Sequence, residues 1–236
     1  MAQARGGARF DWRGLLVLVG IYLVVVVLWP YPVIYPLKVF VVLCHEMSHG
    51  IAALVTGGNI VQIEVSDQLG GLTVTRGGAP LVITSAGYLG SLLFGVALLL
   101  VGTRTRLAPQ ATAALGILVT LVAWRYMPPD TFGRRFAAVM GVLLVALAAV
   151  RRPVPEIALR VLGITSCLYA ILDIKEDVLD TEHTQSDAAL LEQQTGVPAY
   201  VWGVLWIGVS LVVTVVAAKW AVTGPPATDE KKRKRA

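Results

Sequence analysis

The sequence predicts an all-α polytopic membrane protein with six or seven helices and a small β-hairpin. Its composition is 56% hydrophobic and only 15% charged, with a mean hydropathy of +0.71, whereas a soluble domain carries about 25% charged residues. Apolar stretches of helical length follow one another, separated by turns rich in glycine, proline or charge. No polar stretch between them reaches the size of a soluble domain, so residues 1–224 are expected to form a single membrane domain.

The first apolar segment, residues 14–28, is expected to be a retained membrane anchor rather than a cleaved signal peptide. Trp12 and Trp29 bracket it, as aromatic residues do at the membrane interface. No small-residue cleavage site follows the segment. Instead, Pro30 and Pro32 break the helix before the second apolar segment begins.

The later apolar segments are predicted to be helices, although two of them are short for a bilayer that needs about 20 residues. If all seven segments cross, the basic N-terminal and C-terminal ends lie on opposite sides, against the tendency of Lys and Arg to stay in the cytoplasm. Six crossings place both ends in the cytoplasm, so the number stays open between six and seven. The later segments cover residues 37–55, 79–101, 108–124, 136–150, 157–174 and 200–220.

Residues 60–76 depart from the helical pattern and predict a β-hairpin, with an irregular loop as the alternative. Apolar and polar side chains nearly alternate in the first half of this stretch, and Gly70 and Gly71 provide the turn. An exposed strand edge can pair with an extended peptide. Asn59, Gly70 and Gly71 are therefore candidates for contact with a substrate.

Small residues within the apolar segments predict close helix packing. Gly87, Ser91 and Gly95 recur every four positions, and such a stripe lets another helix approach closely. Cys44 and Cys167 also fall in apolar segments, where they are expected to be small core residues and not a disulfide.

The stretch His45-Glu46-Met47-Ser48-His49 is the most specific motif in the chain, an H-E-x-x-H sequence inside an apolar segment. Residues four apart share a helix face, so His45 and His49 can present two imidazoles to one Zn²⁺. Glu46 can reach a water molecule beside that metal and act as a general base. Burying these groups without such a partner would cost several kcal/mol. The motif therefore predicts a zinc metalloendopeptidase with its site at bilayer depth.

Asp173 is the candidate for the third protein ligand that a catalytic zinc usually has. It stands near the end of the apolar segment 157–174, where a carboxylate needs a partner. Asp177, one helical turn on, is a second ligand, an outer partner of a ligand histidine, or a solvated charge. His183 is the one other histidine, and it is expected to face water in a polar stretch.

These residues resemble the site-2-protease group of intramembrane zinc metalloproteases, most closely its peptidase B-like branch. The similarity covers about residues 35–210. It implies a three-helix catalytic core formed by residues 37–55, 79–101 and 157–174. It also implies Asp173 as the third zinc ligand and a membrane protein as the substrate. The stretches that carry the resemblance are residues 44–53, 85–91, 169–178, 186–188 and 195–198 with Trp202.

Two other functions fit parts of this pattern. A non-catalytic membrane protein that keeps a metal only for stability needs His45, His49 and Asp173 but not Glu46. A transporter can also hold charged groups within the membrane, but it is expected to show repeated broken helices, and the motif occurs once. One zinc ion is the expected cofactor, and lipids and a transmembrane protein substrate are the expected partners. The oligomeric state is not predicted.

The net charge of +5 comes mainly from the two ends of the chain. Arg5, Arg9 and Arg13 precede the first apolar segment, and residues 225–236 form a basic tail that is expected to be disordered. Beside a membrane segment, such charge marks the cytoplasmic side or contacts anionic lipid, and no nucleic acid is expected as a partner. The bias toward Ala, Val, Gly and Arg indicates a bacterium, so the expected location is the inner (plasma) membrane.

Overall fold

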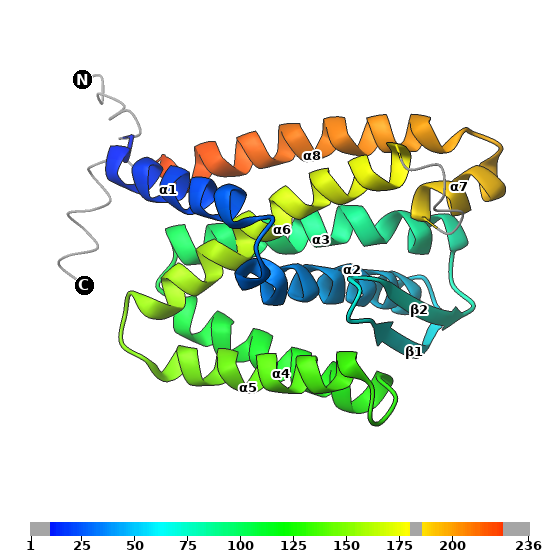
Figure 1. The fold of residues 1–236 in the computed structure, drawn as a ribbon, viewed down its shortest axis with the longest axis horizontal. Helices are drawn as coiled ribbons and strands as arrows, with labels where there is room; N and C mark the ends of the chain where they lie inside the picture. The colour runs from blue at the N-terminus through cyan, green and yellow to red at the C-terminus, as the bar shows by residue number, and fades with distance from the viewer. Residues whose placement is uncertain (1–9, 180–185, 224–236) are drawn as a thin grey trace, which may run out of the picture.

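The computed structural model describes residues 10–179 and 186–223, without the side chains of residues 173 and 175–179. Helices dominate this part of the chain, and one two-stranded hairpin lies beside them (Figure 1). The predicted all-α fold with a small hairpin is therefore confirmed. The elements are α1 (Trp12–Leu28), a 3₁₀ turn η1 (Pro32–Ile34), α2 (Tyr35–Val55), β1 (Asn59–Val65), β2 (Gly71–Arg76), α3 (Pro80–Arg104), α4 (Ala108–Tyr126), α5 (Phe132–Ala149), α6 (Val154–Leu179), α7 (Asp187–Thr195) and α8 (Ala199–Val222).

Several of these helices are long and apolar enough to cross a membrane, and α1 is apolar but shorter. Each apolar segment predicted from the sequence forms a helix. The short helix α7 was not predicted, because it lies in a polar stretch between the last two apolar segments. His183 and the basic tail at 225–236 lie outside the described residues. The five candidate spans are Pro32–Val55, Pro80–Arg104, Phe132–Ala149, Val154–Leu172 and Ala199–Val222.

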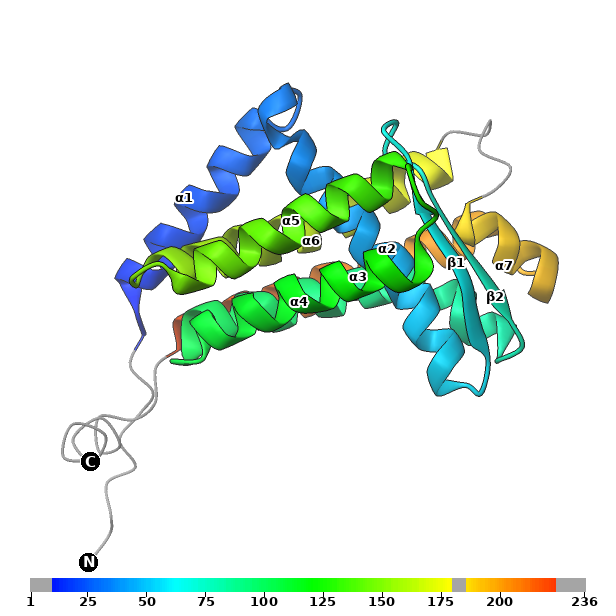
Figure 2. The same ribbon diagram turned by 90° about the horizontal axis from the view of Figure 1, so that it is seen from below.

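The two ends of the described chain lie together at one end of the molecule. The backbone N–H of Asp11 donates to the carbonyl oxygen of Val222 at 2.7 Å, and Phe10 pairs with Thr223 in an isolated β-bridge. After the bend that follows Leu28, α2 continues in the same direction along the long axis as α1 (Figures 1 and 2). The second of these helices, together with η1, is by itself long and apolar enough to span a membrane, so the number of crossings stays open between six and seven.

The hairpin predicted at residues 60–76 is confirmed. β1 and β2 pair in antiparallel orientation, with one irregularity in register between Ile60 and Gln62. The turn closes where the N–H of Ser66 donates to the carbonyl oxygen of Gly70 at 2.8 Å. β1 packs on α2, and its buried Ile63 belongs to the same apolar core as the buried face of that helix. The hairpin therefore lies alongside the helix that carries the histidine motif.

Helix α3 packs closely against α6 through small residues. A Cβ added at Gly95 would lie 2.9 Å from the carbonyl oxygen of Gly163, so only glycine permits this approach. The hydroxyl of Ser166 donates to the carbonyl oxygen of Ser91 at 2.7 Å. The predicted packing role of Ser91 and Gly95 is thus confirmed. Gly87, the first residue of the same stripe, faces the histidine motif instead.

Candidate metal centre

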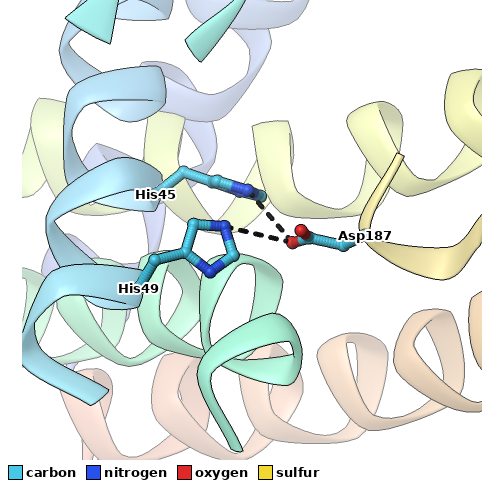
Figure 3. A group of neighbouring side chains, drawn as sticks. All are labelled: His45, His49 and Asp187. Atoms are coloured by element: carbon cyan, nitrogen blue, oxygen red, sulfur yellow. Dashed lines mark ion pairs between the residues drawn. The ribbon is translucent and has the colours of Figure 1, made fainter. Parts of the chain in front are cut away.

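His45 and His49 project from α2 toward the beginning of α7 (Figure 3). Their common direction follows from the helical repeat, which places residues four apart on one face. The Nε2 atom of His45 lies 3.2 Å from Oδ2 of Asp187, and Nε2 of His49 lies 3.4 Å from the same oxygen. These three residues offer ligand atoms that all lie within 4.8 Å of one another and could hold a metal ion.

Both imidazoles are held by groups on α3. The Nδ1 atom of His49 lies 2.7 Å from the main-chain carbonyl oxygen of Ile83, so the ring donates a proton there. Its Nε2 then carries no proton and faces Asp187 with its lone pair. This is the tautomer that binds a metal. The ring of His45 packs edge-on against Tyr88, with 5.0 Å between the ring centroids. The sequence position of the histidines and their neighbours on α3 together set the orientation of the donors.

Asp187 reaches the histidines because α7 begins beside them. Ser186 caps this helix, and its hydroxyl accepts from the N–H of Ala189 at 3.3 Å. The Oδ2 atom of Asp187 is buried and accepts no hydrogen bond from a described residue. Burial alone raises the pKa of Asp187, but the facing imidazoles of His45 and His49 hold this pKa at about 2. A buried, ionised carboxylate is costly unless positive charge faces it, and a cation held between Asp187 and the two imidazoles would supply that charge.

Gly87 keeps open the space between these donors. A Cβ at this position would lie 2.3 Å from Nε2 of His45 and 2.4 Å from Oδ2 of Asp187. Zinc lies about 2.0–2.2 Å from nitrogen and carboxylate oxygen ligands, and two ligands of a tetrahedral zinc are then about 3.3 Å apart. The separations of 3.2 and 3.4 Å match this value. The two histidine–aspartate separations therefore suit a shared metal ion, and all three ligand atoms lie within 4.8 Å of one another.

Glu46 turns from α2 toward the hairpin and is only 5% exposed. Its Oε2 atom accepts a hydrogen bond from the hydroxyl of Thr73 at 2.6 Å, and the same hydroxyl lies 3.0 Å from the carbonyl oxygen of Glu46. The other carboxylate oxygen, Oε1, lies against Gly71, where an added Cβ would come within 2.2 Å of it. Strand β2 therefore fixes the carboxylate through one hydrogen bond and one close backbone contact.

A cleft of about 980 Å³ gives access to these groups. Its walls come from α2, the hairpin, the beginning of α3 and α7. Gly71, Thr73 and Thr75 of β2 line one side, and Leu190 and Gln194 of α7 line another. Hydroxyl and amide groups in these walls give water a route to donors that lie between apolar helices.

His45, Glu46 and His49 of the motif all line this cleft, and so do Gly70 and Gly71. Asn59 begins β1 and is not among the described residues that line the cleft. The side chains of Asp173 and Asp177 lie outside the described residues, so their predicted roles stay predictions. The structure supplies a different carboxylate for the third position.

Asp187 was not predicted as a ligand, because the expected third ligand was a carboxylate inside an apolar segment. Asp187 instead lies in a polar stretch far along the chain from the histidines. A local signal was present, since Ser186 followed by a run of Ala and Leu is typical of a helix start. Residues 186–188 were also among the stretches that carried the family resemblance.

The family model described as Peptidase M50B-like matches residues 18–217 of the chain. This range includes α2, the hairpin, α3, α6 and α7, and therefore every donor of the candidate centre. No curated protein and no solved structure gives a match.

Proposed function

Because the chain belongs to the Peptidase M50B-like family, we propose that it is an intramembrane zinc metalloprotease that cuts membrane-embedded or membrane-proximal substrates. The observation that supports this most directly is the convergence of His45, His49 and Asp187 beside the buried Glu46. The motif lies on one of the helices that are long and apolar enough to cross a membrane. The plasma membrane of a bacterium is the proposed location.

We assign His45, His49 and Asp187 as the ligands of one zinc ion, with Asp187 in the role first expected for Asp173. Zinc at such a site lowers the pKa of a water molecule and polarises a peptide carbonyl group. Glu46 takes a proton from the water and passes it to the leaving amine. Thr73 holds the carboxylate of Glu46 by its hydrogen bond to Oε2, which limits the rotation of the base between these two steps.

The substrate is proposed to bind in an extended form along β2. β1 pairs with one edge of β2, and Gly71, Thr73 and Thr75 line the cleft. Main-chain hydrogen bonds to the other edge would hold an extended peptide next to the metal ligands. A transmembrane helix must unwind locally to bind in this way, because its peptide bonds are hidden by their own hydrogen bonds. Gly70 and Gly71 are the proposed contacts, with Asn59 at the far end of the hairpin.

Removal of the metal is expected to abolish cleavage, and addition of zinc is expected to restore it. The purified protein in lipid vesicles is treated with a chelator and mixed with model transmembrane peptides, and the products are identified by mass spectrometry. A metal-stabilised protein without activity would cleave no peptide even when loaded with zinc and folded. A transporter would move a solute across the vesicle membrane without forming peptide fragments. Either result from the zinc-loaded protein would contradict the hydrolase proposal.

Thr73→Val is expected to lower kcat by about 10- to 100-fold, because a hydrogen bond to a charged group contributes about 1.5–3 kcal/mol. Zinc content should stay unchanged, since no ligand is altered, and Thr73→Ser should restore the rate by returning the hydroxyl. Thr105→Val makes the same chemical change outside the cleft and serves as the control. Equal loss of kcat in Thr73→Val and Thr73→Ser would show that the hydroxyl is not what positions Glu46.

A further inference from the structure

The tip of the hairpin, residues 66–70, holds a leucine in an unusual backbone conformation. Leu69 has a φ of +63°, in the left-handed region that residues with a Cβ seldom adopt. This conformation costs a leucine free energy that glycine would not lose. Such strain persists only where the surrounding structure fixes it, and it is frequent at ligand-binding sites. The surroundings of the Leu69 side chain therefore bear on function.

Hydrogen bonds hold the tip in place against α2. The hydroxyl of Ser66 accepts from the backbone N–H of Gly70 at 3.0 Å. The hydroxyl of Tyr35, the first residue of α2, donates to the carbonyl oxygen of Asp67 at 2.7 Å. The hairpin therefore runs alongside α2, with its tip near the start of that helix (Figure 2). These contacts fix the level along α2 at which Leu69 lies.

Leu69 forms an apolar wall of the cleft together with Val42 and Tyr169. All three residues line the cleft. Val42 and Tyr169 are buried members of one apolar core, and Leu69 packs against that core while it stays partly exposed. The wall thus joins α2, the hairpin tip and α6. No Lys or Arg is among the described residues that line the cleft, so the imidazoles of the metal centre are the basic groups described there.

This apolar wall lies close to the proposed general base. Val42 precedes Glu46 by four residues and therefore shares its face of α2, and both residues line the cleft. Four residues of helix rise about 6 Å, which is about the length of two residues of extended chain. A peptide that lies along β2 and presents its scissile bond to Glu46 would bring a neighbouring side chain to the wall.

We propose that Leu69, Val42 and Tyr169 form a subsite that selects an apolar substrate side chain within about two residues of the scissile bond. This preference, which rests on the proposed function, narrows the class of substrate. An aliphatic side chain leaves water and gains apolar contacts against the wall. An acidic side chain would lose its hydration there without a Lys or Arg among the described lining residues to receive it.

Paired peptides measure the preference. Mass spectrometry first locates the bond that the protein in lipid vesicles cleaves in a model transmembrane peptide. Leucine, alanine and aspartate are then placed in turn at the neighbouring positions. At one of them, kcat/KM for leucine should exceed that for alanine by about 10- to 200-fold, the usual effect of missing methylene groups in an apolar pocket, and aspartate should be poorer still. A natural protein without this preference would overturn the subsite.

Substitutions of Leu69 separate the side chain from the backbone. Leu69→Gly suits the left-handed backbone and removes the side chain, so most of the preference for leucine should disappear. Leu69→Asn also tolerates this backbone but presents an amide, and it should lose the preference as well. Leu69→Met keeps the apolar character and the volume, and it should retain the preference. Equal loss of rate on the leucine and alanine peptides would show that Leu69 only anchors the tip, and would overturn the proposal.

Asp130→Gly is the matched control for the backbone. Asp130 also has a positive φ, of +61°, but it is exposed and is not among the described residues of the cleft. The change to glycine should therefore leave the preference for leucine at its natural value. A loss of preference in this variant equal to that in Leu69→Gly would overturn the assignment to the side chain of Leu69.

Trapping tests the subsite without proteolysis. Leu69→Cys is combined with Glu46→Gln and mixed with peptides that carry one cysteine, at successive positions, as a disulfide with thiopyridine. The thiolate at residue 69 attacks the peptide sulfur, forms a new disulfide and releases thiopyridine. Cys44 and Cys167 are buried and should react slowly. Trapping should be concentrated at one or two neighbouring positions, and equal trapping along the peptide, or none, would overturn the proposal.

The two proposals fail in different ways. A peptide that is trapped at residue 69 but is never cleaved by the zinc-loaded natural protein would contradict the proposed function and leave the subsite as a peptide-binding site. Cleavage without a preference for leucine would contradict the subsite and leave the proposed function intact.

Discussion

Replacing Glu46 with glutamine is expected to lower the cleavage rate by about 10²–10⁴-fold, the usual contribution of a general base, while the metal stays bound. Glutamine keeps the size of the side chain and can still accept a hydrogen bond from Thr73. It cannot take a proton from water. The donors His45, His49 and Asp187 are unchanged, so the zinc content should equal that of the natural protein. Measurement of kcat with a transmembrane peptide, together with metal analysis, checks both parts.

Glu64→Gln is the matched control, because Glu64 is exposed on β1 and is not among the described residues of the cleft. It makes the same chemical change and should retain the natural rate. Full activity of Glu46→Gln would show that Glu46 is not the general base. The metal would then have a role that does not need Glu46. Loss of zinc together with activity would instead mean that Glu46 binds the metal, contrary to the assignment.

Asp187→Ala is expected to lose the metal and all cleavage, while Asp173→Ala keeps both. Among the described residues, Asp187 supplies an oxygen that faces both imidazoles, at 3.2 and 3.4 Å. Removal of a group that only supports a ligand costs about 10–100-fold in metal affinity, and removal of the ligand itself should cost more. Zinc content after dialysis against a weak chelator measures the difference between the two variants.

The comparison separates the two candidates for the third ligand. Asp187→Asn keeps the shape of the side chain, and a folded, zinc-poor protein with this change would exclude misfolding as the cause. Loss of zinc in Asp173→Ala with retention in Asp187→Ala would restore the original assignment and reject Asp187.

The parts of the site that depend on local sequence could be predicted. The spacing of His45 and His49 determines that both lie on one helix face, because the helical repeat does not depend on the rest of the fold. Alternation of apolar and polar residues gave the hairpin for a similar reason, since side chains alternate along a strand. Gly71 also belongs to this group, because a glycine in a strand often marks a close approach of another group.

The parts that depend on tertiary packing could not be predicted in the same way. Asp173 was favoured because a carboxylate within an apolar segment needs a partner. Asp187 reaches the histidines only because α7 packs between α3 and α8, and nothing in its polar surroundings indicates that it is buried. Similarly, the stripe of small residues correctly indicated close packing, but one of its members, Gly87, makes room for the metal donors. Gly87 and Gly95 thus belong to one stripe on α3 but serve different purposes.

The carbonyl group that orients His49 belongs to the main chain of residue 83. Any amino acid that preserves α3 supplies this oxygen, so relatives can diverge freely at that position while the ring keeps its tautomer. One turn later, at residue 87, a single methyl group would collide with both His45 and Asp187. An alignment of this family should therefore show variation at residue 83 and near-invariance at residue 87. Sequence conservation alone would therefore reveal the contribution of residue 87 to the zinc ligands and miss that of residue 83.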